Sequence, residues 1–330
     1  MAFQAAVVGG GSWGTTVAHL VSHNVETKLW CRDEEVAKSI THNHRNRRYL
    51  GNYELNPKLQ ASTDLEEVVS NADVVLMAIP SQSYRQVFKD LLKYLNIDVP
   101  VISLSKGLEQ QSHLTMTELM KIESPRNPTG VLTGPNLAAE VLEGYATASV
   151  VAAEDDTLRT EIPEIFSTDT FRVYTSNDVI GCELGGAFKN VLALAVGMTT
   201  GLGTGDNTRA AVVTRGLAEL ARLGAAMGGM PETFSGLAGL GDLVATCYSK
   251  QSRNRYVGEQ LGKGRAISEV LQEMSNVAEG VVTAPAVSEL AKKNGVETPI
   301  SDQVTAVIKG ETTVNEAYDV LLLREQRSER

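Results

Sequence analysis

The chain has 330 residues, of which 42% are hydrophobic and 21% charged, and its formal net charge is −10. This length allows two domains of ordinary size, and the composition is that of a globular protein rather than of a disordered or collagen-like chain. The excess of negative charge argues against a nucleic-acid partner, because most of the surface would repel a long polyanion. A small anion needs only a local group of donors and is not excluded.

The cysteines and the longest apolar stretch exclude several other classes. Cys31, Cys182 and Cys247 are far apart and form no C-x-x-C motif, so we expect neither a disulfide framework nor a metal site. The apolar run at the start has no basic leader and soon ends in glycines, as a strand does. Residues 184–205 are interrupted by Lys189 and by several glycines and threonines. We therefore expect a cytoplasmic protein without a membrane span.

The first half of the sequence alternates short β-branched runs with amphipathic segments, which is typical of βαβ units around a parallel sheet. Residues 12–21 and 84–95 carry apolar side chains at helical spacing, so each predicts a helix. Thr63 and Glu66 have the spacing of a capping box before a short helix. Strands are expected near residues 5–8, 27–30, 74–79, 101–103, 131–133, 148–152 and 172–174.

Beyond about residue 176 the alternation stops and long helical patterns replace it. We expect an α/β domain with a parallel-rich sheet at 1–178 and an all-α domain at 179–330, with the active site in a cleft between them. The clearest helical patterns of the second half are residues 184–198, 208–223, 267–274 and 284–293.

A glycine-rich loop follows the first predicted strand and opens the first predicted helix, in the pattern Gly9-x-Gly11-x-x-Gly14. Gly9 would make the tight turn, Gly11 would let the backbone approach a pyrophosphate, and Gly14 would allow close packing of helix on strand. The N–H groups at the helix start would bind the phosphates, with Ser12 and Trp13 beside them. This context favours a Rossmann-like NAD(P)-binding domain over a glycine-rich turn without a ligand.

The second predicted strand ends with Arg32 and Asp33, and two interpretations of this pair remain open. Asp33 could bind the ribose 2′-hydroxyl of NAD(H), or the Arg32 guanidinium could bind the 2′-phosphate of NADP(H) bidentately. The basic run at residues 44–48 could add to the field around a phosphate, or it could be a solvated loop. Both coenzymes are therefore expected as candidates, without a metal.

Lys189 is the only charged residue between Glu183 and Asp206, in an otherwise apolar, helix-like run. Such a lysine either extends to water or is held in a cleft for a purpose. In a cleft, partial desolvation would lower its pKa toward neutrality and suit it to proton transfer.

Three further segments carry candidate site residues. Residues 105–107 and 134–136 follow predicted strand ends, at the sheet edge where ligands bind in open α/β folds. In the second half, residues 239–243 are followed by Ser-Arg-Asn-Arg at 252–255. That run suits a phosphate, because it combines a guanidinium with neutral donors, and it could equally be the polar start of a helix.

In this order and at these spacings, the motifs resemble those of the bacterial-type NAD(P)-dependent glycerol-3-phosphate dehydrogenases over essentially the whole chain. The resemblance implies a Rossmann-like first domain and a helical second domain of the kind found in 6-phosphogluconate dehydrogenases. It rests on Gly-Gly-Gly-Ser-Trp-Gly-Thr at 9–15, Ser-Lys-Gly at 105–107, Gly-Pro-Asn at 134–136 with Ala138 and Glu140, Glu-Leu-Gly-Gly-Ala-Phe-Lys-Asn at 183–190, Gly-Leu-Gly-Asp-Leu at 239–243, Ser-Arg-Asn-Arg at 252–255, and Glu279-Gly280.

The resemblance also implies an activity, the reversible reduction of dihydroxyacetone phosphate to sn-glycerol 3-phosphate with NADH or NADPH, which supplies glycerophospholipid synthesis. Lys189 is then the proton donor and acceptor. The substrate site would comprise Lys106, Gly134, Asn136, Lys189, Asp242, Ser252, Arg253 and Asn254. The cofactor site would comprise Gly9, Gly11, Ser12, Trp13, Gly14, Arg32, Lys106, Ala138, Arg253 and Glu279.

Two other functions are compatible with parts of this sequence. Another hydroxy-acid dehydrogenase of the same group would share the glycine loop, but the region 242–254 together with Lys189 favours a phosphorylated triose. A dinucleotide-sensing protein without turnover would need to have lost a catalytic group, whereas Lys106, Lys189 and Asp242 are all present. The helical half could also offer a homodimer face, which one sequence does not distinguish from internal packing.

Overall fold

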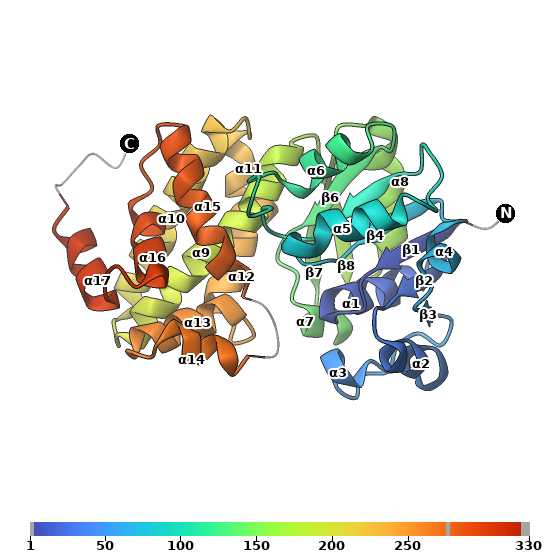
Figure 1. Ribbon diagram of the computed structural model, residues 1–330, viewed down its shortest axis with the longest axis horizontal. Helices are drawn as coiled ribbons and strands as arrows, with labels where there is room; N and C mark the ends of the chain where they lie inside the picture. Colours follow the sequence, from blue (N-terminus) through green and yellow to red (C-terminus); the bar gives the residue numbers. More distant parts are fainter. Residues whose placement is uncertain (1–2, 275–277, 325–330) are drawn as a thin grey trace. The chain divides into compact units, whose positions relative to one another are not determined.

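The computed structural model describes residues 3–274 and 278–324. The chain divides into two compact units, Met1–Glu183 and Leu184–Arg330 (Figure 1). This division falls five residues after the expected boundary at 178/179, inside helix α9 (Val179–Gly201). The first turn of α9 belongs to the first unit, where the Glu183 carboxylate accepts a hydrogen bond from the backbone N–H of Thr117 at 2.9 Å.

The first unit is built on a single eight-stranded sheet with the order β3-β2-β1-β4-β5-β6-β7-β8. Neighbouring strands are parallel except β6 and β7, which are antiparallel. This confirms the expected parallel-rich α/β fold. The short edge strand β3 was not expected, because its three residues show no apolar alternation. The strands are β1 (Gln4–Val8), β2 (Glu26–Trp30), β3 (Gln60–Ser62), β4 (Val74–Met77), β5 (Val101–Ser103), β6 (Thr129–Thr133), β7 (Thr147–Ala153) and β8 (Phe171–Ser176).

Helices connect these strands, and two of the sequence-based details were wrong. The helix after β3 is capped by Asp64, whose carboxylate accepts from the N–H groups of Glu66 and Glu67, so Thr63 does not form the expected capping box. The helix expected at 84–95 begins after Pro80 and ends earlier, although Leu95 is still buried. The helices are α1 (Ser12–Val21), α2 (Glu34–Asn43), α3 (Arg47–Leu50), α4 (Leu65–Val69), α5 (Ser81–Leu91), α6 (Met116–Glu123), α7 (Ala138–Leu142) and α8 (Asp156–Phe166).

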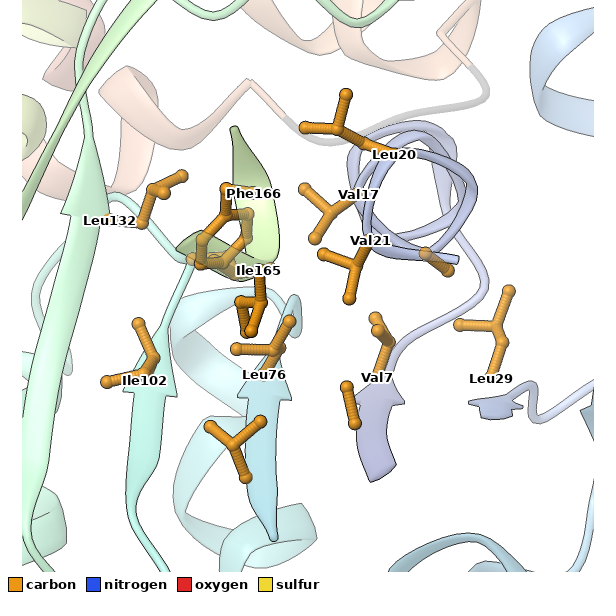
Figure 2. Packing of buried hydrophobic residues seen from close by; sticks show 14 of the residues in the cluster. Val7, Val17, Leu20, Val21, Leu29, Leu76, Ile102, Leu132, Ile165 and Phe166 are labelled. Atoms are coloured by element: carbon orange, nitrogen blue, oxygen red, sulfur yellow. The ribbon is translucent and has the colours of Figure 1, made fainter. Parts of the chain in front are cut away.

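Both faces of the sheet are covered, which explains why its central strands β1, β4, β5 and β6 are buried at nearly every position. Successive residues of β1 enter different clusters: Val7 packs with α1 and α8, and Val8 packs with α4, α5 and α6. In Figure 2, Val17 and Val21 of α1 lie over the strands that carry Val7 and Leu76. This packing fixes the start of α1 against the carboxyl end of β1, where the glycine loop lies.

The second unit is helical, and its described residues contain no strand, as expected. The predicted segments lie in α9, α10, α14 and α15, although α15 starts earlier than predicted and continues through Pro285. Besides most of α9, the unit comprises α10 (Asp206–Ala226), α11 (Pro231–Ser235), the π-helical turn η1 (Leu237–Gly241), α12 (Asp242–Tyr248), α13 (Arg253–Gly262), α14 (Ile267–Gln272), α15 (Glu279–Lys293), α16 (Pro299–Lys309) and α17 (Val314–Leu322).

Helix α9 is the one helix in the described ranges that is long and apolar enough to cross a membrane, and 94% of its most apolar window is buried in the protein.

The glycines of α9 allow a close crossing with α13. A Cβ atom on Gly197 would lie 2.2 Å from the carbonyl oxygen of Arg255, and one on Gly258 would lie 2.1 Å from that of Leu194. Because no side chain separates the two backbones, α9 and the start of α13 are held together.

Candidate active site

The glycine loop has the geometry that its spacing predicts. The N–H of Gly9 donates to the carbonyl oxygen of Trp30 at 3.0 Å, so the loop is tied to the end of β2. Gly9 has a φ of 125°, and a Cβ atom on Gly14 would lie 1.9 Å from the oxygen of Gly9, so the fold requires glycine at both positions. A Cβ atom on Gly11 would meet nothing within 4 Å. The fold does not require Gly11, which leaves the approach of a ligand as the reason for a glycine there.

Two unsatisfied groups at the start of α1 fit a dinucleotide. The Nε1–H group of Trp13 is buried and has no partner among the described residues. The N-cap residue Gly11 supplies no side-chain hydrogen bond to the first turn. Uncapped N–H groups at the N-terminus of a ten-residue helix can bind phosphate oxygens. The residues present therefore suit the coenzyme that the sequence predicts.

The loops after β5 and β6 meet at the carboxyl edge of the sheet. The Lys106 ammonium donates to the carbonyl oxygen of Gly134 at 2.7 Å, which brings the two expected loops together. Asn136 accepts a hydrogen bond from Ser149 at 2.7 Å, and its Nδ2 atom is buried without a partner in the part of the chain described. The Thr133 hydroxyl is also buried and has no partner among the residues that the structure describes. Thr133 was missed in the sequence, where its only signal is a polar residue closing an apolar strand.

Lys189 lies in the core of the second unit rather than extending to water. Its Nζ atom donates to the carboxylate of Asp242 and to the hydroxyl of Thr246, the latter at 2.8 Å. The side chains of Lys189 and Asp242 are 7% and 2% exposed. The Asp242 carboxylate balances the charge of the buried Lys189 ammonium. Thr246 was not predicted as a site residue, although it lies one helical turn after Asp242.

The π-helical turn η1 explains how this pair forms. A Cβ atom on Gly185 would lie 2.5 Å from the carbonyl oxygen of Ala238, so α9 and η1 approach to backbone contact. Lys189 follows Gly185 by about one turn of α9, and Asp242 follows η1 directly. π-Helical turns are rare and are frequent at functional sites. The glycines of both motifs thus bring a lysine and an aspartate together across 53 residues.

The run 252–255 begins helix α13, as one of its two interpretations predicted. Ser252 is the N-cap, and its hydroxyl accepts from the N–H of Arg255 at 3.2 Å. The Asn254 amide is buried; it donates to Oδ1 of Asn190 and accepts from the N–H of Gly280, both at 2.9 Å. Asn254 therefore connects the helix of Lys189 to the start of α15, a role the sequence did not indicate.

Arg253 and Glu279 lie near each other at the starts of α13 and α15. Desolvation by neighbouring atoms lowers the pKa of the Arg253 guanidinium, and the negative charge of Glu279 opposes this shift. Both residues were expected to touch the cofactor. A guanidinium that has lost part of its hydration is well suited to bind an anion.

Each unit thus carries one group of the expected residues. The first unit combines the glycine loop, Arg32 at the end of β2, the Lys106–Gly134 contact, Asn136, and Ala138 at the start of α7. The second combines Lys189 with Asp242, and Ser252, Arg253 and Asn254 with Glu279. No group of three or more His, Cys, Asp or Glu side chains suited to a metal ion occurs within the described ranges. Burial raises the pKa of the neighbouring Cys247 thiol to about 12, so this cysteine is no nucleophile at neutral pH.

A glycine loop on a doubly wound sheet, joined to a helical unit with a buried lysine–aspartate pair, defines a dehydrogenase of the Rossmann class. The comparisons with known proteins are more specific. Residues 4–159 match the model of the NAD-dependent glycerol-3-phosphate dehydrogenase N-terminus, and residues 178–319 match that of the C-terminus. The chain belongs to the NAD-dependent glycerol-3-phosphate dehydrogenases, a family of oxidoreductases.

Individual relatives agree with this assignment. The chain is 51% identical to glycerol-3-phosphate dehydrogenase (NAD(P)+) 2 of Sphingopyxis alaskensis over 98% of this chain and 97% of that protein. It is 50% identical to the Mycobacterium avium enzyme over 97% and 94% of the two chains. The crystal structure of glycerol-3-phosphate dehydrogenase from Coxiella burnetii matches with a TM-score of 0.93 at 35% identity, over 98% of this chain and 99% of that one.

Proposed function

We propose that this protein reduces dihydroxyacetone phosphate to sn-glycerol 3-phosphate, reversibly, with NADH or NADPH. The names of the relatives support this reaction, and the chemistry rests on one observation: a lysine ammonium held by Asp242 and Thr246 inside the helical unit. The alternative of another hydroxy-acid dehydrogenase has weaker support. D-mandelate dehydrogenase matches with a TM-score of 0.62 at 15% identity, which reflects the fold alone.

Lys189 is the proposed proton donor. Reducing a ketone requires a hydride at the carbonyl carbon and a proton at the carbonyl oxygen, and the reduced nicotinamide supplies the hydride when bound. Negative charge develops on that oxygen as the C–H bond forms. A buried ammonium beside it stabilises the charge and then transfers a proton, and such stabilisation contributes several kcal/mol, roughly, in a water-poor site. Asp242 and Thr246 fix the direction in which the ammonium points.

Arg253 is the proposed phosphate ligand, together with Ser252 and Asn254. One amide hydrogen of Asn254 is used by Asn190, which leaves the second for a substrate oxygen. The phosphate group of the substrate takes no part in the reaction at the carbonyl. Arg253 therefore contributes by using the free energy of phosphate binding to orient the reacting carbon. The substrate without a phosphate should therefore react poorly.

The remaining expected residues complete the proposal. The first unit, which the sequence predicted at 1–178, is the proposed NAD(P)-binding domain, and the second, predicted at 179–330, is the proposed substrate-binding and catalytic domain. The proposed substrate contacts are Lys106, Gly134 and Asn136 of the first unit and Lys189 and Asp242 of the second. We further propose that the protein is cytoplasmic, that its product supplies glycerophospholipid synthesis, and that the helical unit offers a homodimer face. The proposed cofactor contacts are Gly9, Gly11, Ser12, Trp13, Gly14, Arg32, Lys106, Ala138, Arg253 and Glu279.

The test is the initial rate of NADH and NADPH oxidation by the purified full-length chain, followed by absorbance, with dihydroxyacetone phosphate and with dihydroxyacetone. Rapid oxidation that requires the phosphate supports the proposal. Folded protein that binds a dinucleotide but oxidises neither coenzyme with dihydroxyacetone phosphate would refute the substrate. A 2-keto acid, tested in parallel, would identify the alternative function.

A further inference from the structure

Both oxygens of the Asp33 carboxylate accept hydrogen bonds from other residues of the protein. Its Oδ1 atom accepts from the N–H groups of Glu35 at 2.9 Å and Val36 at 3.2 Å, so Asp33 is the N-cap of α2. Its Oδ2 atom accepts from Nη1 of Arg48 at 2.7 Å. An acidic residue at the end of the second strand binds the ribose hydroxyls in NAD-specific enzymes. Here that residue caps a helix and neutralises an arginine instead.

Arg48 is held beside the glycine loop although it lies far along the chain. The buried Asn46 donates to the carbonyl oxygen of Gly10 at 3.0 Å and to the hydroxyl of Thr15 at 2.8 Å. The hydroxyl of Ser12 donates to the carbonyl oxygen of Tyr49 at 3.2 Å, across 37 residues. These bonds fasten both ends of the segment that carries Arg48 to the loop at the start of α1. Arg48 therefore belongs to the coenzyme end of the sheet.

At the end of β2, Arg32 forms no ion pair within the described residues. Arg32 and Arg48 are both exposed, and Asp33 balances one of them. Of the two acidic residues in the first turn of α2, Glu34 pairs with Lys38 at 2.6 Å and Glu35 adds one further negative charge. Arg32 precedes Asp33 in the chain and Arg48 is bonded to the Asp33 carboxylate, so both guanidinium groups are candidates to bind one phosphate.

We propose that Arg32 and Arg48 together bind the 2′-phosphate of NADP(H), and that Asp33 holds Arg48 and does not bind the ribose of NAD(H). This inference rests on the proposed function of the first unit and extends it to a choice of coenzyme. It identifies Arg48 as a residue that determines coenzyme specificity. Arg48 lies in the basic run at residues 44–48, which the sequence predicted either to add to the electrostatic field around a phosphate or to be a solvated loop. The expected consequence is tighter binding of NADPH than of NADH.

Calorimetric titration of the full-length chain isolates the phosphate contact from turnover. The two probes are adenosine 2′,5′-bisphosphate and adenosine 5′-monophosphate, which differ only in the 2′-phosphate. Arg48→Gln should weaken the bisphosphate about tenfold, as loss of a charge-assisted hydrogen bond does, and leave the monophosphate unchanged. Arg45→Gln is the matched control, because Arg45 in the same basic run pairs with Glu54 at 3.8 Å. Equal weakening of both probes by Arg48→Gln, or equal effects of the two variants, overturns the inference.

Asp33→Asn tests the other half of the proposal. Asparagine is also a good N-cap, so α2 keeps its start while the charge is lost. The dissociation constant of NADH should change by less than about twofold, since Asp33 does not contact the ribose; loss of a ribose contact to a charged group would cost about tenfold or more. A tenfold loss of NADH binding in Asp33→Asn overturns the inference.

The wild-type titrations separate this inference from the function on which it rests. A wild-type chain that binds NADH as tightly as NADPH contradicts the coenzyme choice and leaves the proposed reaction intact. If the folded chain binds neither dinucleotide and neither nucleotide probe, both the proposed function and this inference are wrong.

Discussion

Lys189 and Asp242 form an ion pair in which the two side chains are 7% and 2% exposed. Charges buried this deeply are stable only as a pair. Removing one partner from such a pair costs about 3–5 kcal/mol, because the other charge stays buried without compensation. A variant of Lys189 alone therefore changes both chemistry and stability, and the two effects need separate measurements.

Lys189→Met should lower kcat about 10³-fold, the size expected for loss of a positioned proton donor, with a smaller change in KM. Steady-state kinetics measure this. The double variant Lys189→Met with Asp242→Asn should regain most of the lost free energy of unfolding, since the stranded charge is removed, yet stay inactive. Near-normal turnover in Lys189→Met would show that another group supplies the proton.

Arg253→Ala should raise KM for dihydroxyacetone phosphate about tenfold to a hundredfold, the cost of losing charge-assisted hydrogen bonds. At a saturating concentration of coenzyme, the loss of rate with dihydroxyacetone, which has no phosphate, should be much smaller. Arg255→Ala is the control, because Arg255 on the same helix is 3.7 Å from Glu259 and has a partner of its own. Equal losses with both substrates would mean that Arg253 acts on the fold or the coenzyme.

Two alanine substitutions in the glycine loop should have different effects. Gly14→Ala places a Cβ atom 1.9 Å from the oxygen of Gly9 and should destabilise the first unit by about 1–3 kcal/mol, as overpacking does. Gly11→Ala meets no atom within 4 Å. It should leave stability within about 0.5 kcal/mol but weaken coenzyme binding about tenfold, because the added methyl group occupies the approach of the pyrophosphate. Urea unfolding and titration with NADPH test the pair, and normal binding by Gly11→Ala would argue against a pyrophosphate at this loop.

Glu219 makes the stability of the second unit depend on pH. Its carboxyl is 2% exposed and accepts from the N–H groups of Ile300 and Ser301 at the start of α16. Burial raises its pKa from 4.5 to about 7, and the hydrogen bonds from Ile300 and Ser301 oppose the shift.

Because the folded protein then binds this proton more tightly than the unfolded chain, the contribution is complete below about pH 4.5 and is lost as the pH rises to about 7. The difference in free energy of unfolding between wild type and Glu219→Gln should fall by about 3 kcal/mol over this range. Urea titrations at several pH values measure it. Glu269→Gln, at an exposed position of α14, should give a flat difference, and a flat line for Glu219→Gln would contradict the prediction.

Periodicity was sufficient for most of the sheet and for the long helices, because a parallel strand covered on both faces must be apolar and a buried helix must repeat every three to four residues. It failed for β3, which has three residues at the sheet edge, and for the cap of α4, where Asp64 lies beside a threonine that fits the pattern as well. Short elements have too few residues to show a period.

The sequence by itself determined the features that depend on neighbouring residues: the glycine loop between a strand and a helix, and a single lysine in an apolar run. The folded structure was needed to show which groups form hydrogen bonds or ion pairs with each polar atom. The partners of Lys189 lie 53 and 57 residues away along the chain, and those of Asn254 lie 64 and 26 residues away. Arg48 binds Asp33 across 15 residues. Such hydrogen bonds follow from where packed helices cross, and no local spacing encodes that crossing. The commitment of Asp33 to α2 and Arg48, which directs the choice of coenzyme, could therefore be seen only in the folded chain.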